Sequence, residues 1–399
     1  MIKISNIKSI VSWNEATNSL TIDKNKFIYI KDNKIVAISN DNQSFDYEID
    51  AENTIITPGF IDCHTHPVFN DARASEFHLR ALGKTYHEIS ESGGGINSSV
   101  NSLRNLSEDD LYEKCLSRMD SFLFNGTTTL EAKSGYGLSL EDEIKSLNVI
   151  KKINDSHVLD LIPTFLGAHS IPDEYKNNKA DYIDLICNVM IPEVAKLKLA
   201  EFCDVFCENK YFNFDDSYKI LKKAKEYGLI PRMHADEFED SRGLELAIKV
   251  NAISADHLMA ANNKMFKEMA DAGIISVLLP GTTFFLGQKN YVNAKEMIEN
   301  GCEIALASDF NPGSCTINSL PQIMFLAMAY CNMSFEEVFK GVTINAAKAI
   351  NRSLELGLIK NNYNADLLFW DIDSIYEIPY WFNSEKIVKI IKNGKLISL

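Results

Sequence analysis

The chain has 399 residues, of which 46% are hydrophobic and 24% charged, a balance typical of a globular protein with a large buried core. This composition excludes a largely disordered chain. With 40 basic against 55 acidic residues and a formal net charge of −15, we expect no nucleic-acid partner, because phosphate binding needs a basic surface. A small anionic substrate remains compatible with this charge if a few Arg or Tyr side chains gather locally.

The sequence carries no signal for a membrane or for secretion. No apolar run approaches the roughly 18 residues of a membrane helix, and the first twelve residues lack a long apolar run, so we expect neither a span nor a signal peptide. The eight cysteines show no framework spacing, which predicts reduced thiols and a cytoplasmic location. Cys203 and Cys207 form a CxxxC without a second ligand pair, so we expect no structural zinc there.

Both ends of the sequence have the pattern of short strands joined by turns. Asp32–Asn33 and Asn393–Gly394 are turn pairs between such strands. We therefore predict a small discontinuous β-sandwich domain built from residues 1–54 and 360–399. The predicted strands are Ser19–Ile22, Lys26–Lys31, Lys34–Ile38, Asp366–Trp370, Ile387–Ile391 and Lys395–Ser398.

The middle of the chain, residues 55–359, alternates short apolar runs with helix-period segments. Eight βα repeats in this length predict an α/β fold, a (β/α)8 TIM-like barrel. A doubly wound open sheet is the alternative, weakened because no Gly-rich phosphate fingerprint follows the first run. The runs are Ile55–Cys63, Thr127–Ala132, Val158–Leu166, Ala200–Phe206, Leu229–Met233, Ala252–Ala255, Ile274–Leu278 and Glu303–Ala307; the helical segments include Glu108–Phe124, Glu141–Ile153, Phe214–Tyr227 and Ser241–Val250.

Two of these helical segments begin with an N-cap pattern. Ser107 precedes Asp110 by three residues, and Ser139 precedes Asp142 by the same spacing. A serine hydroxyl at this position accepts a hydrogen bond from a free N–H of the first helical turn. We therefore predict that helices begin directly after Ser107 and Ser139.

Five of the eight histidines follow predicted barrel strands. His64 and His66 follow the first run, His169 the third, His234 the fifth and His257 the sixth. Asp309 follows the eighth run, and Glu237 lies three residues beyond His234. Functional side chains of a barrel project from the carboxyl ends of its strands, so we expect all of these groups at one mouth. A single histidine in such a place is more often a core or surface residue, but the set as a whole indicates a site.

The histidines and the aspartate form a ligand set suited to one divalent metal ion. His64 and His66 of one strand, with a third histidine and Asp309 from other strands, are the predicted ligands, with Zn²⁺ or Fe²⁺ as the ion. Such a site leaves a position for a water molecule, whose pKa falls on the metal. His257, Glu237 and Asp309 are the predicted catalytic acid and base groups. Together they predict metal-assisted hydrolysis of a C–N bond at an electrophilic carbon.

Several motifs resemble those of the amidohydrolase superfamily and, within it, of the imidazolonepropionase family. The resemblance covers nearly the whole chain, and HTH alone would indicate only the superfamily. The motifs are PGFIDCHTH at 58–66, Arg73, Tyr86–Ile89, Gly93–Ile96, EAKSGYG at 131–137, GAH at 167–169, Glu201–Glu208, HADEF at 234–238, ADH at 255–257, Leu278–Thr282 and DFNPGS at 309–314.

This resemblance implies hydrolytic opening of 4-imidazolone-5-propanoate to N-formimidoyl-L-glutamate in histidine degradation. It implies His64, His66, His234 and Asp309 as the metal ligands. Members of the superfamily commonly form homodimers, so it also implies a homodimer. Arg73 would bind the propanoate, because a guanidinium can donate two hydrogen bonds to a carboxylate. The substrate- and product-contacting positions that it implies are Arg73, Tyr86, Tyr136, His169, Glu237, Asn311, Gly313 and Ser314.

Two positions near the predicted site have alternative interpretations. Lys133 could bridge two metals after carboxylation, but the one-metal family favours a structural or supporting role. The family usually has glycines shortly before the substrate arginine, where this chain has Asn70–Asp71–Ala72. Asn tolerates left-handed backbone, so Asn70 could replace one of those glycines.

Two other functions remain as alternatives. One is a related cyclic amidohydrolase or nucleobase deaminase, for which a carboxylate-binding arginine would have no purpose. The other is a non-catalytic barrel that serves as a scaffold, which the complete ligand set disfavours.

Overall fold

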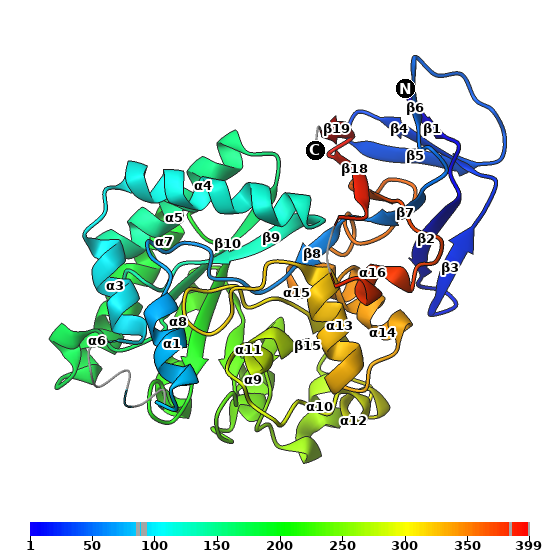
Figure 1. Ribbon diagram of the computed structural model, residues 1–399. Coiled ribbons are helices and arrows are strands. Elements are labelled where there is room, and N and C mark those ends of the chain that lie inside the picture. The colour runs from blue at the N-terminus through cyan, green and yellow to red at the C-terminus, as the bar shows by residue number, and fades with distance from the viewer. Residues whose placement is uncertain (85–87, 89–93, 383–384, 398–399) are drawn as a thin grey trace.

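The computed structural model describes residues 1–84, 88, 94–382 and 385–397. It contains three sheets: a parallel barrel and two smaller sheets built from both ends of the chain (Figure 1). The predicted (β/α)8 barrel with a β-sandwich is therefore confirmed, and the doubly wound alternative is wrong.

The barrel sheet has the order β16-β15-β14-β13-β11-β10-β9-β8, and every pairing in it is parallel; the short β12 also pairs with β11. The seam between the first and last strands is joined beyond their ends, where Thr65 and Phe310 form a parallel bridge. The strands are β8 Phe60–Asp62, β9 Thr127–Lys133, β10 Asp160–Ala168, β11 Phe202–Cys207, β12 Ile230–Pro231, β13 Met233–Ala235, β14 Ser254–His257, β15 Ile275–Leu278 and β16 Ile304–Leu306.

Helices follow the barrel strands, as the alternation predicted. Helix α4 covers the predicted residues, and the Ser107 hydroxyl accepts from the Asp110 N–H as expected of its cap. Ser139 caps α5 in the same way. The α-helices are α1 Ala74–Ala81, α3 Ile96–Arg104, α4 Glu108–Phe124, α5 Leu140–Ser156, α6 Lys179–Leu185, α7 Ile191–Leu197, α8 Phe214–Glu226, α9 Gly243–Val250, α10 Phe266–Asp271, α11 Pro280–Phe285, α12 Ala294–Glu299, α13 Leu320–Tyr330, α14 Phe335–Gly341, α15 Ile344–Ala349 and α16 Glu377–Tyr380; shorter turns are η1 Asp173–Tyr175, η2 Ile186–Met190 and η3 Asn263–Met265.

The blue N-terminal strands and the red C-terminal strands lie together at one side of the barrel (Figure 1). They form a four-stranded sheet, β5-β4-β1-β6, and a six-stranded sheet, β19-β18-β17-β7-β2-β3. Ile28 and Ile30 of one sheet share a buried cluster with Ile56 and Phe369 of the other, which makes a sandwich. The strands are β1 Ile2–Ser5, β2 Ser9–Asn14, β3 Ser19–Asp23, β4 Phe27–Lys31, β5 Lys34–Ser39, β6 Tyr47–Asp50, β7 Ile55–Pro58, β17 Leu367–Trp370, β18 Ile387–Lys392 and β19 Lys395–Ile397.

The predicted first barrel strand, Ile55–Cys63, is two strands in two sheets. Its first part is β7, which pairs with β2 and β17, and its second part is β8 of the barrel. Gly59 lies between them, and a Cβ there would come within 2.2 Å of the Thr128 hydroxyl. The chain can therefore leave one sheet and enter the other only because residue 59 has no side chain. The predicted domain division at residues 54 and 360 stays a prediction.

A buried ion pair joins the C-terminal hairpin to the barrel. The Lys392 Nζ lies 2.5 Å from a carboxylate oxygen of Asp160, at the start of β10, and 2.8 Å from one of Asp366. The small sandwich is thus held to the end of the barrel away from the strand mouth, because Asp160 stands at the amino end of its strand.

Candidate active site

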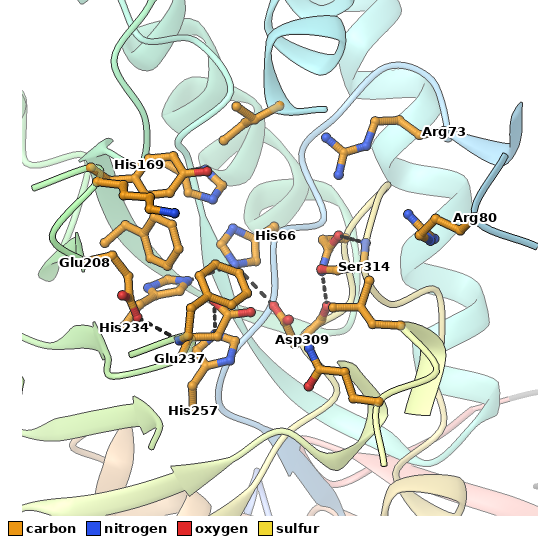
Figure 2. Close-up of a pocket in the computed structure, with 18 of the residues that line it drawn as sticks. His66, Arg73, Arg80, His169, Glu208, His234, Glu237, His257, Asp309 and Ser314 are labelled. Carbon is orange, nitrogen blue, oxygen red and sulfur yellow. Dashed lines mark hydrogen bonds and ion pairs between the residues drawn. The ribbon is translucent and has the colours of Figure 1, made fainter. Parts of the chain in front are cut away.

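The predicted histidines and Asp309 come together at the carboxyl ends of the barrel strands (Figure 2). His64 and His66 follow β8, His234 lies in β13, His257 ends β14, and Asp309 follows β16. All of them are buried. The common mouth that the alternation of runs predicted is therefore present.

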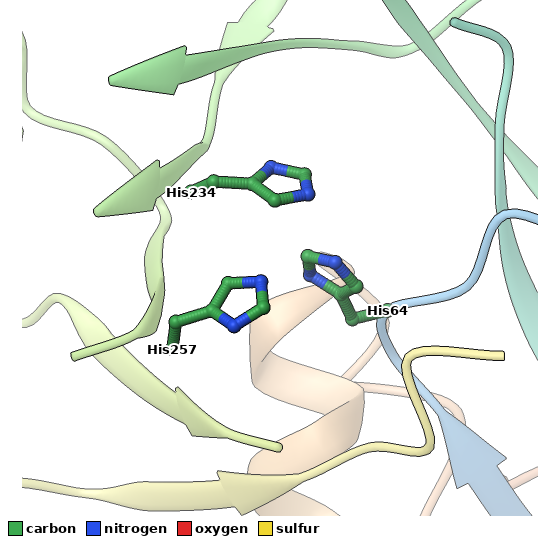
Figure 3. A group of neighbouring side chains, drawn as sticks. All are labelled: His64, His234 and His257. Atoms are coloured by element: carbon green, nitrogen blue, oxygen red, sulfur yellow. The ribbon is translucent and has the colours of Figure 1, made fainter. Parts of the chain in front are cut away.

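The ligand atoms of this cluster lie within contact of one another. The Nε2 atoms of His66 and His234 are 3.3 Å apart, and Asp309 Oδ1 is 3.4 Å from His66 Nε2 and 3.5 Å from His64 Nε2. Figure 3 shows that the rings of His64, His234 and His257 also face a common centre. Two nitrogens held tetrahedrally by one zinc ion at 2.0–2.1 Å would lie about 3.4 Å apart. The observed spacing fits that of a divalent-metal site.

Buried carboxylates fix the protonation of two of these rings. His64 Nδ1 lies 2.6 Å from Asp256 Oδ2, and His234 Nδ1 lies 3.0 Å from Asp204 Oδ1. A carboxylate only accepts hydrogen bonds, so each Nδ1 carries the proton and each Nε2 presents a lone pair. Among the described residues, the buried Nε2 of His64 has no hydrogen-bond partner. The lone pair of His64 Nε2 thus faces Asp309 Oδ1, which is also an acceptor. A cation between these atoms would satisfy both, and this supports the fit of a metal ion.

A fully buried charge network lies beneath the histidines. Lys133 Nζ contacts Glu131 at 2.9 Å and Asp204 at 2.8 Å. The Arg232 guanidinium contacts Asp256 at 2.9 Å and donates to the Cys63 carbonyl at 2.7 Å. Burial alone would raise the pKa of Asp204, but its cationic neighbours hold that pKa well below its usual range. Asp204 thus stays charged while it accepts from His234.

Sequence reasoning missed Asp204, Asp256 and Arg232, although a signal existed. Each lies within or beside a short, buried barrel strand. A charged residue in a buried strand must be paired, so it should have been sought as part of a site. Lys133 belongs to the same network, in the supporting place that its sequence context favoured.

Burial also sets the ionisation of the remaining histidines and of Glu237. Burial lowers the pKa of His64, His66 and His169 well below the usual histidine value. It lowers the pKa of His257 to about 3. These four rings are therefore neutral at pH 7. Burial, and then the charge of Asp309, raises the pKa of Glu237 well above the usual value. Glu237 Oε2 lies 3.7 Å from His257 Nε2. A neutral imidazole and a carboxyl group whose ionisation is disfavoured therefore stand side by side at the cluster.

Asp309 and His257 adopt left-handed backbone, with φ of 52° and 76°. This conformation is uncommon outside glycine and asparagine, and it concentrates at functional sites. It lets the Asp309 N–H donate to the His64 carbonyl at 3.1 Å, while Asp309 Oδ2 accepts from the Thr282 hydroxyl at 2.5 Å. The other oxygen, Oδ1, is thereby turned to the histidines.

The loop after Asp309 forms one wall of the pocket. The Asn311 side-chain oxygen accepts from the N–H groups of Gly313 and Ser314 at 2.8 and 2.7 Å, so that this short turn is fixed by its own asparagine. A Cβ on Gly313 would lie 1.2 Å from Arg73 Nη2. The guanidinium of Arg73 therefore occupies the space that the side chain of any other residue at 313 would fill.

Arg73 lies in the pocket wall, as predicted, with a side chain only 8% exposed. Its Nε and Nη1 have no hydrogen-bond partner among the described residues, and Glu76 lies 3.5 Å from Nε. Asn70 does not supply left-handed backbone. Its side-chain amide instead donates to the Ser102 hydroxyl at 2.8 Å, so the expectation of a glycine-like role for Asn70 is wrong.

The loop that carries Tyr136 is held by a buried carboxylate that the sequence did not reveal. Glu143 accepts from the N–H groups of Gly135, Gly137 and Leu138 at 3.1, 2.9 and 2.8 Å. The Gly135 carbonyl lies 2.9 Å from Nδ1 of His169, whose ring stacks on His66 with centroids 5.0 Å apart. Glu143 thus shapes the loop that sets both Tyr136 and His169.

These groups surround one cavity of about 890 Å³. Tyr86 lies outside the described residues, so its predicted contact is not located. The cavity wall also contains residues that sequence reasoning did not select, among them Arg80, Phe206, Glu208, Lys210, Tyr211 and Phe238.

A profile of the amidohydrolase family matches residues 55–397. The chain belongs to the amidohydrolase family. It is 43% identical over 392 residues to an imidazolonepropionase from Geobacillus sp. (strain WCH70), covering 96% of this chain and 92% of that one. It is 44% identical over 369 residues to an imidazolonepropionase from Thermoanaerobacter pseudethanolicus, covering 92% and 89%. An imidazolonepropionase from Clostridium tetani is 41% identical over 387 residues, covering 95% and 92%.

Solved structures of this family share the fold at low identity. A 5-methylcytosine deaminase from Klebsiella pneumoniae has a TM-score of 0.75 at 18% identity, covering 99% of this chain and 97% of its own. A guanine deaminase from C. acetobutylicum has a TM-score of 0.73 at 16% identity, covering 100% and 99%. Within the described part of this chain, no helix is long and apolar enough to cross a membrane.

Proposed function

We propose that this chain is an imidazolonepropionase, which adds water across the ring amide of 4-imidazolone-5-propanoate to give N-formimidoyl-L-glutamate. The observation that carries the proposal is one cavity with a histidine-rich cluster at one side and the buried guanidinium of Arg73 at the other. The Nε and Nη1 groups of that guanidinium have no hydrogen-bond partner among the described residues. The relatives at 41–44% identity carry this name.

The proposed metal ligands are His64, His66, His234 and Asp309, and we propose Zn²⁺ or Fe²⁺ as the ion, because both accept these nitrogen and oxygen donors. A divalent ion in such a site lowers the pKa of a water molecule and withdraws charge from a carbonyl oxygen. The hydrogen bonds from His64 to Asp256 and from His234 to Asp204 would hold both rings in the orientation that binding needs.

The remaining side chains would orient the substrate and move protons. Arg73 would pair with the propanoate, and Tyr136 and His169 would contact the ring. The carboxyl group of Glu237, with its raised pKa, can donate a hydrogen bond to a ring nitrogen. The neutral imidazole of His257 can donate its N–H to the ring carbonyl oxygen, since its own pKa lies far below 7.

The reaction forms one bond and breaks another. The oxygen of the water bonds to the ring carbonyl carbon, the bond from that carbon to the ring nitrogen breaks, and the nitrogen takes a proton. Asp309 and His257 stand beside the cluster and are the proposed carriers of that proton. Asn311, Gly313 and Ser314 would contact the product.

The alternative of a nucleobase deaminase has the same fold but a poorer match to the pocket. A neutral nucleobase would offer no carboxylate to the buried Arg73 N–H groups that lack a hydrogen-bond partner among the described residues. A non-catalytic scaffold would have no need for five buried ring and carboxylate groups that face a common centre.

The test is an ultraviolet progress curve with freshly generated 4-imidazolone-5-propanoate. We expect enzyme-dependent loss of the imidazolone absorbance, abolished by a chelator and restored by zinc or iron. Absence of turnover in protein that contains a full equivalent of metal would overturn the substrate assignment. Guanine and 5-methylcytosine would then be the next substrates to assay.

We also propose a cytoplasmic location and a homodimer. All eight cysteines are free and buried, which suits a reducing compartment. Light scattering coupled to gel filtration measures the oligomeric state directly: a mass near 45 kDa would contradict the dimer, since one chain has a mass of 44.9 kDa.

A further inference from the structure

Glu208 is a buried acidic residue of the cavity wall that the proposed reaction does not use. It directly follows the last residue of β11, and the pairing of Cys207 with Ala235 places it beside Asp236, where the chain leaves β13. Figure 2 shows Glu208 on the same side of the cavity as Glu237. A buried carboxyl group is costly unless it has hydrogen-bond partners, so the partners of Glu208 indicate its purpose.

Both oxygens of Glu208 accept hydrogen bonds from the loop that joins β13 to α9. Oε1 accepts from the Phe238 N–H at 3.0 Å, and Oε2 accepts from the Ser241 hydroxyl at 3.1 Å. The Ser241 hydroxyl in turn accepts from the Asn209 N–H at 3.2 Å. Burial raises the pKa of Glu208, and hydrogen bonds from the Phe238 N–H, the Ser241 hydroxyl and the Glu237 N–H oppose that rise. The loop after β11 is therefore tied to the loop after β13.

Asp236 fixes the same loop from within. It adopts left-handed backbone, with φ of 53°, and its Oδ1 accepts from the N–H groups of Ser241 and Gly243 at 2.9 Å each. The Asp236 carbonyl oxygen accepts from the Ala260 N–H at 2.8 Å. This last bond joins the loop to the segment that follows His257, so the two loops keep a fixed relation to each other.

Glu237 lies between these fixed residues. Its carboxyl group makes no hydrogen bond within the described part of the chain, and its Oε2 lies 3.7 Å from His257 Nε2, beyond hydrogen-bond distance. The position of this carboxyl group therefore depends on the backbone at Asp236 and Phe238, and Glu208 holds the second of these.

We propose that Glu208 is a positioning residue, which holds Glu237 beside His257 through the N–H of Phe238 and the hydroxyl of Ser241. The benefit to catalysis rests on the proposed function, in which Glu237 meets a ring nitrogen of the substrate, whereas the hold on the loop does not. A displacement of about 1 Å at a reacting group can lower a rate about 100-fold, so a residue that fixes the neighbouring backbone matters even where it touches no reacting atom.

The experiment compares Glu208→Leu with Glu208→Gln in the metal-loaded full chain. Leucine removes both acceptors. Glutamine keeps both contacts without the charge, because its oxygen can accept from the Phe238 N–H while its amide N–H donates to the Ser241 hydroxyl oxygen. The control is Glu226→Leu, the same change in an exposed ion pair with Lys223 on α8.

The first measurement is hydrogen exchange of the peptide that spans residues 236–242, which needs neither substrate nor turnover. In Glu208→Leu we expect the Phe238 amide to exchange about 10-fold faster, because its acceptor is lost and the loop opens more often. Glu208→Gln and Glu226→Leu should keep the wild-type rate. An unchanged rate in Glu208→Leu would overturn the proposal.

The second measurement is a double-mutant cycle on kcat/KM with Glu237→Ala. Glu208→Leu alone should lower kcat/KM about 10- to 100-fold, and Glu208→Gln should stay within about threefold of the wild type. In the Glu237→Ala background, Glu208→Leu should add no further loss, because the group that it positions is absent. Equal losses in both backgrounds would overturn the proposal, because that pattern indicates a general structural role.

Ser241→Ala provides a milder test if Glu208→Leu does not fold. It removes one of the two hydrogen bonds to Glu208, so it should lower kcat/KM by less, and again only while Glu237 is present. The same loss without Glu237 would refute the positioning role. If the wild-type chain hydrolyses no imidazolone, the proposed function is wrong, and the exchange rates alone decide whether Glu208 holds the loop.

Discussion

Replacing Gly313 with alanine would separate the position of Arg73 from its charge. The new Cβ would lie 1.2 Å from Nη2 and 2.1 Å from Cζ of Arg73, whereas ordinary contact needs about 3.5 Å, so the guanidinium would move by roughly 2 Å. Gly313 does not use left-handed backbone. Because the obstacle is the end of a flexible side chain, we expect the free energy of unfolding to change by less than about 1 kcal/mol.

The effect on substrate binding should be much larger. A displacement of roughly 2 Å breaks the hydrogen bonds between Arg73 and a carboxylate, which contribute about 1.5–3 kcal/mol, so KM should rise about 10- to 150-fold. The change in kcat should be small. The assay is steady-state turnover of 4-imidazolone-5-propanoate, with urea unfolding as the check on stability.

The matched control is the double variant Gly313→Ala, Arg73→Ala. Once the guanidinium is absent, the methyl group of residue 313 has nothing to displace, so it should add no further increase in KM to that of Arg73→Ala. A full additional increase in the double variant would refute the reasoning, as would an unchanged KM in Gly313→Ala alone.

Three further predictions concern the supports of the site and one helix. Glu143→Gln replaces one carboxylate oxygen, so one loop N–H loses its acceptor. We expect urea titrations to show a free energy of unfolding lower by about 1–3 kcal/mol, and the KM to rise. Wild-type values of both would contradict a role of Glu143 in setting the Tyr136 loop. Asp256→Asn removes the carboxylate that contacts both His64 and Arg232. Metal affinity, measured by chelator competition, should then fall about 10- to 100-fold. An unchanged affinity would exclude a role of Asp256 in orienting the His64 ring. Ser107→Ala should lower the free energy of unfolding by about 1 kcal/mol, and no change would mean that α4 begins without help from its cap.

The sequence predicted the bounds of a helix well where a single capping residue determines where the helix begins. The α4 helix coincides with its predicted bounds because Ser107 supplies the cap and three acidic residues of the first turn complement the helix dipole. The histidines were found because barrel topology brings the ends of strands together, whatever their separation in sequence.

Other features depend on contacts that no local pattern contains. The apolar residues of Ile55–Cys63 favoured a single strand, although Pro58–Gly59 within it is a turn-type pair. That Gly59 passes Thr128 and that the chain changes sheets there depends on contacts with distant residues. Arg80 belongs to none of the motifs found in the sequence, and only the fold brings it to Gly313. The partners of Asp204 and Asp256 come from separate strands, so their pairing could not be seen in the sequence.

The seam of the barrel has a consequence for how the protein is made. Backbone bonds from Asp309 to His64 and from His66 to Phe310, at 3.1 and 2.8 Å, join the first strand to the last through the metal-site residues themselves. During synthesis, His64 and His66 leave the ribosome long before Asp309, so no nascent chain that ends before residue 309 can assemble the full ligand set. If the proposed ligands hold the ion, the complete site forms only when the first and last strands of the barrel meet, so metal binding and closure of the barrel are coupled.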